Sequence, residues 1–390
     1  MKRILSIDIF RGFTIFMMVF VNDLAAVSQI PAWMKHVAAD VDGMTFVDVV
    51  FPAFLFIVGM SMPFAVQRRL SQSDTKGFWW HVLQRTLGLL ILGVYMVNSE
   101  EMNAEANLIP KWIWAPSLYL AAVMIWNNYR RNESGTMSNT AKVLKGVGWL
   151  ILIALYFLYR KGEAGNLSGM TTSWWGILGL IGWAYLISVI VYVGTGKSRM
   201  GVLAGFTGLG VLYIGIRTQI PFLANSWIGS QSGHLAHSLL VLSGVFCALL
   251  MTKAEEADMH NRKIRNMVLL GLALLILGYL TDPIEGISKI RATPSWTFYC
   301  AGICSILYAC IYWLVDIQGQ SSWASFLEPA GKNPLLTYII PPFIYGLLGL
   351  TFLPDFMNVG WVGFLKAIVF SLLILVVARV LTQKGILLKL

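Results

Sequence analysis

Long apolar runs separated by short polar segments recur along the whole chain. Each run has roughly the 17–25 residues that an α-helix needs to cross a hydrocarbon core about 30 Å thick. We therefore predict an all-α bundle of about twelve transmembrane helices, with ten to twelve possible. The predicted spans are 11–27, 46–66, 79–98, 112–127, 146–160, 175–194, 201–217, 235–252, 267–281, 295–315, 334–353 and 360–381.

The composition supports this class of protein. Hydrophobic residues make up 57% of the chain and charged residues only 12%, and the mean hydropathy is +0.69. A soluble globular protein does not have these proportions. Because no polar stretch is long enough for a soluble domain, we expect a single transmembrane domain over residues 1–390. Asp8 and Arg11 interrupt the approach to the first run, which favours a retained helix over a cleaved signal peptide.

The distribution of basic residues predicts the orientation of the helices. With the N-terminus in the cytoplasm, only eight of the 29 basic residues fall on the outer side, and the other 21 fall inside. The outer eight are Lys35, Lys111, Arg160, Lys161, Arg217, Lys289, Arg291 and Lys366. This bias is typical of a bacterial inner-membrane protein with both termini in the cytoplasm. The net charge of +10 then reflects topology, and we expect no nucleic-acid partner.

Polar residues gather where the first predicted helix ends and the second begins. Asn22 and Asp23 close the first apolar run, His36 follows in the connecting loop, and Asp48 lies one turn inside the second helix. Ionisable groups are costly in a membrane, so such a cluster indicates a functional site unless a partner explains it. For Asp48 the alternative is a structural pairing with Lys35 or Arg291.

Further polar side chains fall on the same predicted outer side. His234 and His237 share a face of the eighth predicted helix, and Lys289 precedes the tenth. Together with Asp23 they are candidates for substrate binding, although packing would also explain the two histidines. We expect no metal, because no third ligand accompanies the histidines. The cysteines lie in apolar segments and are expected to be packing residues: Cys247, Cys300, Cys304 and Cys310.

Several motifs in order resemble the heparan-α-glucosaminide N-acetyltransferase family of membrane acyltransferases. The most specific block contains Phe10-Arg11-Gly12, Phe20-Val21-Asn22, a lone His36 and the segment from Asp48 to Gly59. Weaker matches follow at Arg85…Gly93…Val97-Asn98, Ile287-Ser288-Lys289, Gly331-Lys332-Asn333-Pro334-Leu335 and the basic-aliphatic tail from Lys384 to Lys389.

This resemblance implies acetylation across a membrane. Acetyl-CoA would bind from the cytoplasm, and an amine of an amino sugar or glycan would be acetylated on the far side. His36 takes the place of the family's essential histidine and Asn22 that of its conserved asparagine. The resemblance points to Arg11, Asn98, Lys332 and Asn333 as donor-binding candidates, and it also allows a homodimer.

The chemistry of acetyl transfer suits these residue types. The amine must lose a proton and the tetrahedral oxyanion must be stabilised. His36 would act as general base or as transient acyl carrier, Asn22 would donate to the oxyanion, and Asp48 would orient the imidazole. Arg11 lies eleven residues before Asn22, about 16 Å along a helix, a span comparable to an extended pantetheine arm.

Two alternatives remain open at this level. Asp8 and Arg11 are three residues apart, so they could pair across one helical turn as a structural lock instead of contacting CoA. The whole chain could also be a transporter or flippase for a sugar or lipid-linked glycan, with its outer carboxylates and histidines serving proton coupling. Transporters often contain internal repeats, and we find no convincing repeat between the two halves.

Overall fold

The computed structural model describes residues 4–103, 105–130, 136–163, 166–251, 259–348 and 354–390. These residues are mostly helical, and among them extended pairing is limited to isolated bridges. The α-helices are α1 Leu5–Leu24, α2 Phe46–Leu70, α3 Thr75–Glu100, α4 Lys111–Trp126, α5 Asn139–Leu158, α6 Gly176–Gly194, α7 Arg199–Arg217, α8 Pro221–Ala224, α9 Ser232–Met251, α10 Met259–Glu285, α11 Pro294–Tyr312, α12 Glu328–Lys332, α13 Pro334–Leu348 and α14 Gly360–Gln383.

The prediction of an all-α, multi-pass membrane bundle is confirmed. Ten helices of the described part of the chain are long and apolar enough to cross a membrane. The other two predicted spans correspond to α4, with 16 residues, and α13, with 15. Both contain internal prolines, which remove a backbone hydrogen bond and crowd the preceding turn. Residues 252 and 349–353 of the predicted spans lie outside the described residues.

Several helices begin or end away from their predicted limits; α5, for example, begins at Asn139 rather than at residue 146. α1 begins at Leu5 rather than at residue 11, because the charges of Asp8 and Arg11 neutralise each other on one face of its first turns. α10 continues to Glu285 instead of ending at residue 281, so Asp282 belongs to a helix and not to a loop. The cytoplasmic placement of the termini stays a prediction.

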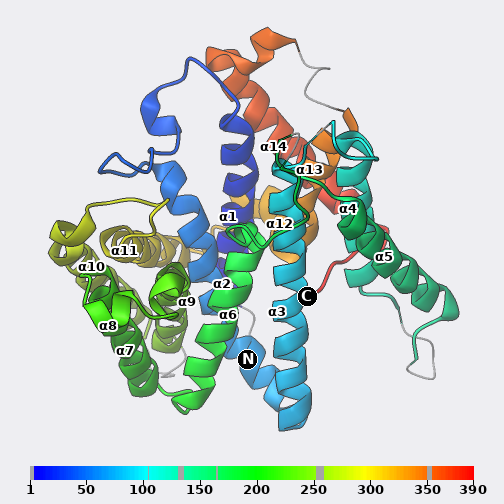
Figure 1. Cartoon of the computed structure of the whole chain (residues 1–390). Helices are drawn as coiled ribbons and strands as arrows, with labels where there is room; N and C mark the ends of the chain where they lie inside the picture. Colours follow the sequence, from blue (N-terminus) through cyan, green and yellow to red (C-terminus); the bar gives the residue numbers. More distant parts are fainter. Residues whose placement is uncertain (1–3, 104, 131–135, 164–165, 252–258, 349–353) are drawn as a thin grey trace.

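Small residues bring α2 and α9 together at the centre of the bundle (Figure 1). A Cβ atom on Gly59 would lie 1.9 Å from the carbonyl oxygen of Val241, and one on Gly244 would lie 1.9 Å from that of Phe56. Only glycine permits such backbone contact, the usual device for packing helices in lipid. This contact holds the middle of α2 against α9, and nearer the start of α2 the Phe51 ring meets His237 of α9.

Candidate functional site

His36 and Asp48 form a hydrogen-bonded pair where the chain passes from α1 to α2. The His36 Nδ1 and Asp48 Oδ1 atoms are 2.7 Å apart. The His36 side chain is 37% exposed, whereas that of Asp48 is 1% exposed. A carboxylate beside Nδ1 favours the tautomer with its proton on Nδ1, which puts the lone pair of the ring on Nε2. The pair therefore has the arrangement of an oriented base.

The start of α2 fixes the Asp48 carboxylate. Its Oδ2 atom accepts hydrogen bonds from the backbone N–H of Thr45 at 3.0 Å and of Val37 at 3.3 Å. The indole N–H of Trp296 donates to the main-chain oxygen of Asp48 at 3.2 Å. One carboxylate oxygen thus belongs to a helix cap, and the other orients His36. Asp48 needs no rearrangement to hold the imidazole.

Lys289 is the cation closest to this pair. Its Nζ atom lies 3.2 Å from each ring nitrogen of His36. Burial lowers the pKa of the Lys289 amine, and the nearby Asp48 carboxylate opposes that shift. Within the described residues no ion pair joins Asp48 to Lys35 or Arg291, so the structural pairing considered for Asp48 is not the one observed.

The loop that carries Lys289 is bound to the loop that carries His36. The Asp42 carboxylate accepts from the Ile287 N–H at 2.7 Å, and the Gly43 N–H donates to the Ile287 oxygen at 3.0 Å. The Ser288 hydroxyl donates to the Ala39 oxygen at 3.3 Å. These bonds cross between segments far apart in sequence, so the two loops hold their functional side chains in one fixed arrangement.

Asp23 and Asn22, predicted to belong to the same site, have different surroundings. Asp23 is 5% exposed and its carboxylate lies 3.0 Å from the Lys366 ammonium. The Tyr345 hydroxyl donates to the other oxygen. Lys366 and Tyr345 therefore already contact both carboxylate oxygens of Asp23, which favours a structural role over acceptor binding. Asn22 is exposed, and the contacts of the described residues do not link it to His36.

The two histidines of α9 are packed among aromatic rings. His237 is 6% exposed, with the Phe51 ring 5.4 Å away and the Trp296 ring 6.3 Å away. His234 lies 5.5 Å from Trp183, centroid to centroid. Among the described residues neither histidine Nδ1 has a hydrogen-bond partner. Trp296 connects His237 to the backbone of Asp48, but no contact joins either histidine to His36.

Arg11 makes the contacts expected of the structural alternative, and its role in donor binding stays a prediction. Its guanidinium contacts the Asp8 carboxylate at 3.0 Å, the Ser61 hydroxyl at 2.6 Å and the Gly331 carbonyl oxygen at 3.4 Å. These bonds tie α1 to α2 and α12, which is the lock considered from the sequence. Arg11 also borders a cavity of about 680 Å³ together with Arg68.

Asn98 is also a structural residue. Its amide nitrogen donates to the carbonyl oxygens of Thr171 at 2.6 Å and Val94 at 2.8 Å, and its oxygen accepts from the Thr171 N–H at 3.2 Å. The side chain is fully buried. It lies near the end of α3 that is predicted to face outwards, and its role in donor binding stays a prediction.

Asn333 binds the chain beyond α14. Its amide nitrogen donates to the Ile386 carbonyl oxygen at 2.9 Å, and its oxygen accepts from the Leu388 N–H at 3.2 Å. The neighbouring Lys332 is partly exposed and forms an ion pair with Glu328. Of these two donor-binding candidates, Lys332 is the one among the lining residues of a cavity within the bundle.

That cavity is a channel of about 240 Å³ within the helix bundle. Apolar side chains line most of it, and the polar groups are Arg85, Lys332, Tyr338 and Lys389. The Arg85 guanidinium lies 4.5 Å from the centre of the Tyr185 ring. In the described part of the chain its buried Nε has no hydrogen-bond partner. Sequence reasoning noted Arg85 in a weak motif without assigning it a role.

The channel extends towards the His36–Asp48 pair. Ile15 and Met18 of α1 line it, and Asn22 lies four residues beyond Met18 on the same helical face, about 6 Å further along the axis. Phe54 of α2 also lines it, six residues after Asp48, or about 9 Å along that helix. The last lining residues of the channel are therefore about 6 Å of helix short of Asn22 and about 9 Å short of Asp48.

Two comparisons with known proteins match this chain. A family model described as "Domain of unknown function (DUF5009)" matches residues 3–217, more than half of the chain. Human heparan-alpha-glucosaminide N-acetyltransferase is 24% identical over an alignment that covers 86% of this chain and 52% of the human protein. The resemblance noted in the sequence is confirmed. The chain spans about half the length of this curated relative.

Proposed function

The chain belongs to the DUF5009 family, and we propose that it is a transmembrane acetyltransferase of a bacterial inner membrane. It transfers the acetyl group of cytoplasmic acetyl-CoA to the amine of an amino sugar or glycan on the other side. The His36–Asp48 pair, with a cation-lined channel approaching it from the opposite end, is the observation that carries the proposal. The acetyltransferase name of the human relative supports the reaction class.

His36 acts as the general base. Its Nε2 atom accepts a proton from the attacking amine while the nitrogen forms a bond to the thioester carbonyl carbon. The carbon–sulfur bond then breaks, CoA leaves as a thiolate, and the proton on His36 neutralises that thiolate. Asp48 stabilises the imidazolium between these steps. In the alternative route His36 itself carries the acetyl group, and ping-pong kinetics would distinguish it.

The oxyanion and the acceptor need hydrogen-bond donors near His36. The Lys289 ammonium, 3.2 Å from the imidazole nitrogens, is placed to donate to either. Asn22 on the channel-facing side of α1 supplies a second donor for the thioester oxygen. Both groups can donate a hydrogen bond to the thioester oxygen, on which negative charge develops during the reaction.

The donor enters through the channel. Arg85, Lys332 and Lys389 line it, and the positive-inside pattern independently assigns all three to the cytoplasmic side. Phosphates attract such cations, and the apolar walls beyond them suit a pantetheine arm. The acetyl end of the donor would then lie near Met18 and Phe54, on the side of the channel nearest the outer pair.

A release assay tests the proposal. Purified protein with acetyl-CoA and glucosamine should release free CoA, and His36→Ala should abolish the release. His260→Ala is a matched control, because His260 binds the Tyr312 hydroxyl at 2.9 Å and has no part in the site. If acetyl-CoA is neither bound nor consumed while a sugar crosses proteoliposomes, the protein is a transporter and the proposal is wrong.

A further inference from the structure

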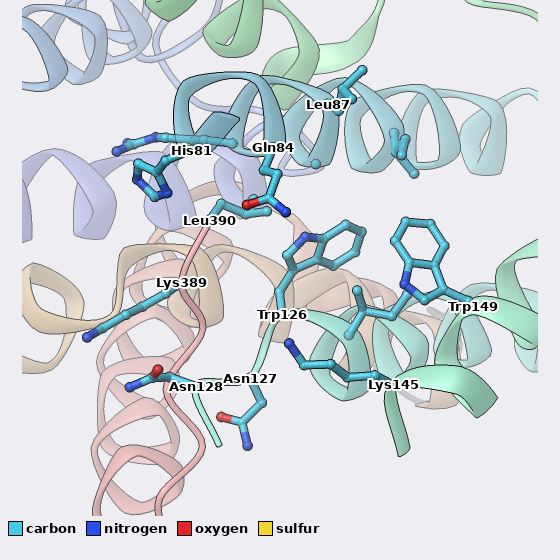
Figure 2. A pocket seen from close by; sticks show the side chains of 14 residues that line it. His81, Gln84, Leu87, Trp126, Asn127, Asn128, Lys145, Trp149, Lys389 and Leu390 are labelled. Atoms are coloured by element: carbon cyan, nitrogen blue, oxygen red, sulfur yellow. The ribbon is translucent and has the colours of Figure 1, made fainter. Parts of the chain in front are cut away.

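A second cavity, of about 430 Å³, adjoins the channel and has no role in the transfer itself. Figure 2 shows it between α3 and the ends of α4 and α5, with Leu390 close to His81 and Gln84. Its lining residues are His81, Gln84, Arg85, Leu87, Gly88, Ile91, Ile125, Trp126, Asn127, Asn128, Lys145, Trp149, Lys389 and Leu390. We call this cavity the vestibule.

The vestibule and the channel are neighbours. Arg85, Lys389 and Leu390 line both of them. By contrast, the cavity beside Arg11 shares no lining residue with the channel. A ligand larger than the channel can therefore extend into the vestibule but not into the cavity beside Arg11.

The chain segment Ile386–Leu390 forms the wall between the two spaces. Five hydrogen bonds fix it, joining Ile386 and Leu388 to Asn333, Leu387 to Asn127 and Asn128, and Lys389 to Trp126, at 2.8–3.2 Å. On its other side the Leu390 side chain presses on α3, since a Cβ on Gly88 would lie 2.3 Å from it. The segment therefore holds the side chain of Lys389 at the junction of both cavities.

The lining of the vestibule suits an aromatic base that carries phosphate. Three cationic side chains (Arg85, Lys145 and Lys389) and the His81 imidazole line it, and no Asp or Glu side chain is among its lining residues. The Trp126 and Trp149 rings lie 5.9 Å apart at its edge and provide aromatic surface for stacking. The buried Arg85 Nε lacks a protein partner among the described residues, which leaves it available to a ligand oxygen.

We propose that the vestibule binds the nucleotide half of acetyl-CoA, with the pantetheine arm in the channel and the segment Ile386–Leu390 between them. Arg85 and Lys389 hold the diphosphate that joins the two halves, and Lys145 binds the remaining phosphate beside the adenine. This assignment rests on the proposed function, and it adds a second binding surface remote from the acetyl group.

Two donors that differ only in the nucleotide test the assignment. Acetyl-CoA reaches the vestibule, whereas S-acetyl-pantetheine fills the channel alone. The measured quantity is the ratio of their kcat/KM values in the release assay. Lys145→Ala and Trp149→Ala should each lower this ratio by about tenfold, the effect of losing one charge-assisted or stacking contact. Lys142→Ala, an exposed lysine of α5 outside the vestibule, should leave the ratio unchanged.

The outcomes separate this assignment from the proposed function. An unchanged ratio in both vestibule variants overturns the assignment while acetyl transfer stands. If the wild-type protein uses neither donor, the proposed function fails. Equilibrium binding of adenosine 3′,5′-bisphosphate then tests whether the vestibule binds a nucleotide. Binding that Lys145→Ala weakens about tenfold and Lys142→Ala does not supports a nucleotide site, and equal binding by all three proteins excludes it.

Discussion

Two buried carboxylates at the same end of the bundle have opposite surroundings. Asp23 is 5% exposed and its partners Lys366 and Tyr345 are themselves mostly enclosed. Asp48 is 1% exposed, yet its partner His36 has a side chain that is 37% exposed. We call Asp23 the closed carboxylate, because Lys366 neutralises its charge inside the protein. We call Asp48 the open carboxylate, because its hydrogen-bond partner His36 can be reached by solvent or a substrate.

Two arginines at the other end differ in the same way. Arg11 bonds to Asp8, Ser61 and Gly331, whereas Arg85 stacks on Tyr185 and keeps a buried nitrogen without a hydrogen-bond partner among the described residues. A charge in a membrane protein is expensive in both cases. Unused bonding capacity, rather than burial of charge, is what distinguishes a binding site from a structural contact.

The largest effect is expected at the open carboxylate. Asp48→Asn keeps the size of the side chain and an oxygen for the helix cap, but it cannot neutralise the imidazolium. The kcat of acetyl transfer should fall by about 10²–10⁴-fold, the range of a general base. Asp23→Asn is the matched control, with a much smaller loss of kcat per folded molecule. Equal losses in the two variants would remove the distinction between the carboxylates.

The closed carboxylate should instead govern stability. Lys366→Met leaves Asp23 charged and buried without its cation, at a cost of about 3–5 kcal/mol. Thermal unfolding of the detergent-solubilised protein measures this loss. The double variant Asp23→Asn with Lys366→Met should recover most of it, because no unpaired charge remains. A double variant as unstable as the single one would show that the ion pair is not the cause.

The two arginines should separate affinity from stability. Arg85→Ala removes a charge-assisted contact to phosphate and should raise the Kd of acetyl-CoA about 10–100-fold. Arg11→Ala should lower the unfolding temperature and change that Kd little. Calorimetric titration and thermal unfolding of both variants give the two quantities. A Kd that rises more for Arg11→Ala would show that acetyl-CoA binds in the cavity beside Arg11 instead.

Local pattern was enough to predict most of the fold. Ten apolar runs are helices long enough to span a membrane, because run length directly reflects membrane thickness. The proximity of His36 and Asp48 was also foreseeable, since only twelve positions separate them and a helix starts between. α4 has 16 residues, as predicted, and α13 is described over 15 residues because the rest of its predicted span, 349–353, lies outside the described residues.

Tertiary contacts account for what the sequence could not predict. Lys289 reaches His36 across 253 positions, and Lys366 reaches Asp23 from α14. The spacing of residues in the sequence does not show whether a polar side chain will be paired with such a distant partner or will have none. The sequence therefore predicted Asp23 to bind substrate. It assigned no role to Arg85, whose Nε has no hydrogen-bond partner among the described residues.

The smallest predicted effect concerns Lys289, an intermediate case between open and closed. Burial lowers its pKa, so it loses its proton at a lower pH than an ordinary lysine, whose pKa is about 10.4. Because the folded state binds this proton more weakly than the unfolded state, the contribution of Lys289 to stability rises with pH through that interval. The kcat/KM of the wild type should correspondingly decline on the alkaline side as the ammonium is lost. Lys289→Arg keeps its charge there and should move the decline to higher pH, whereas identical pH profiles would show that Lys289 acts only by packing.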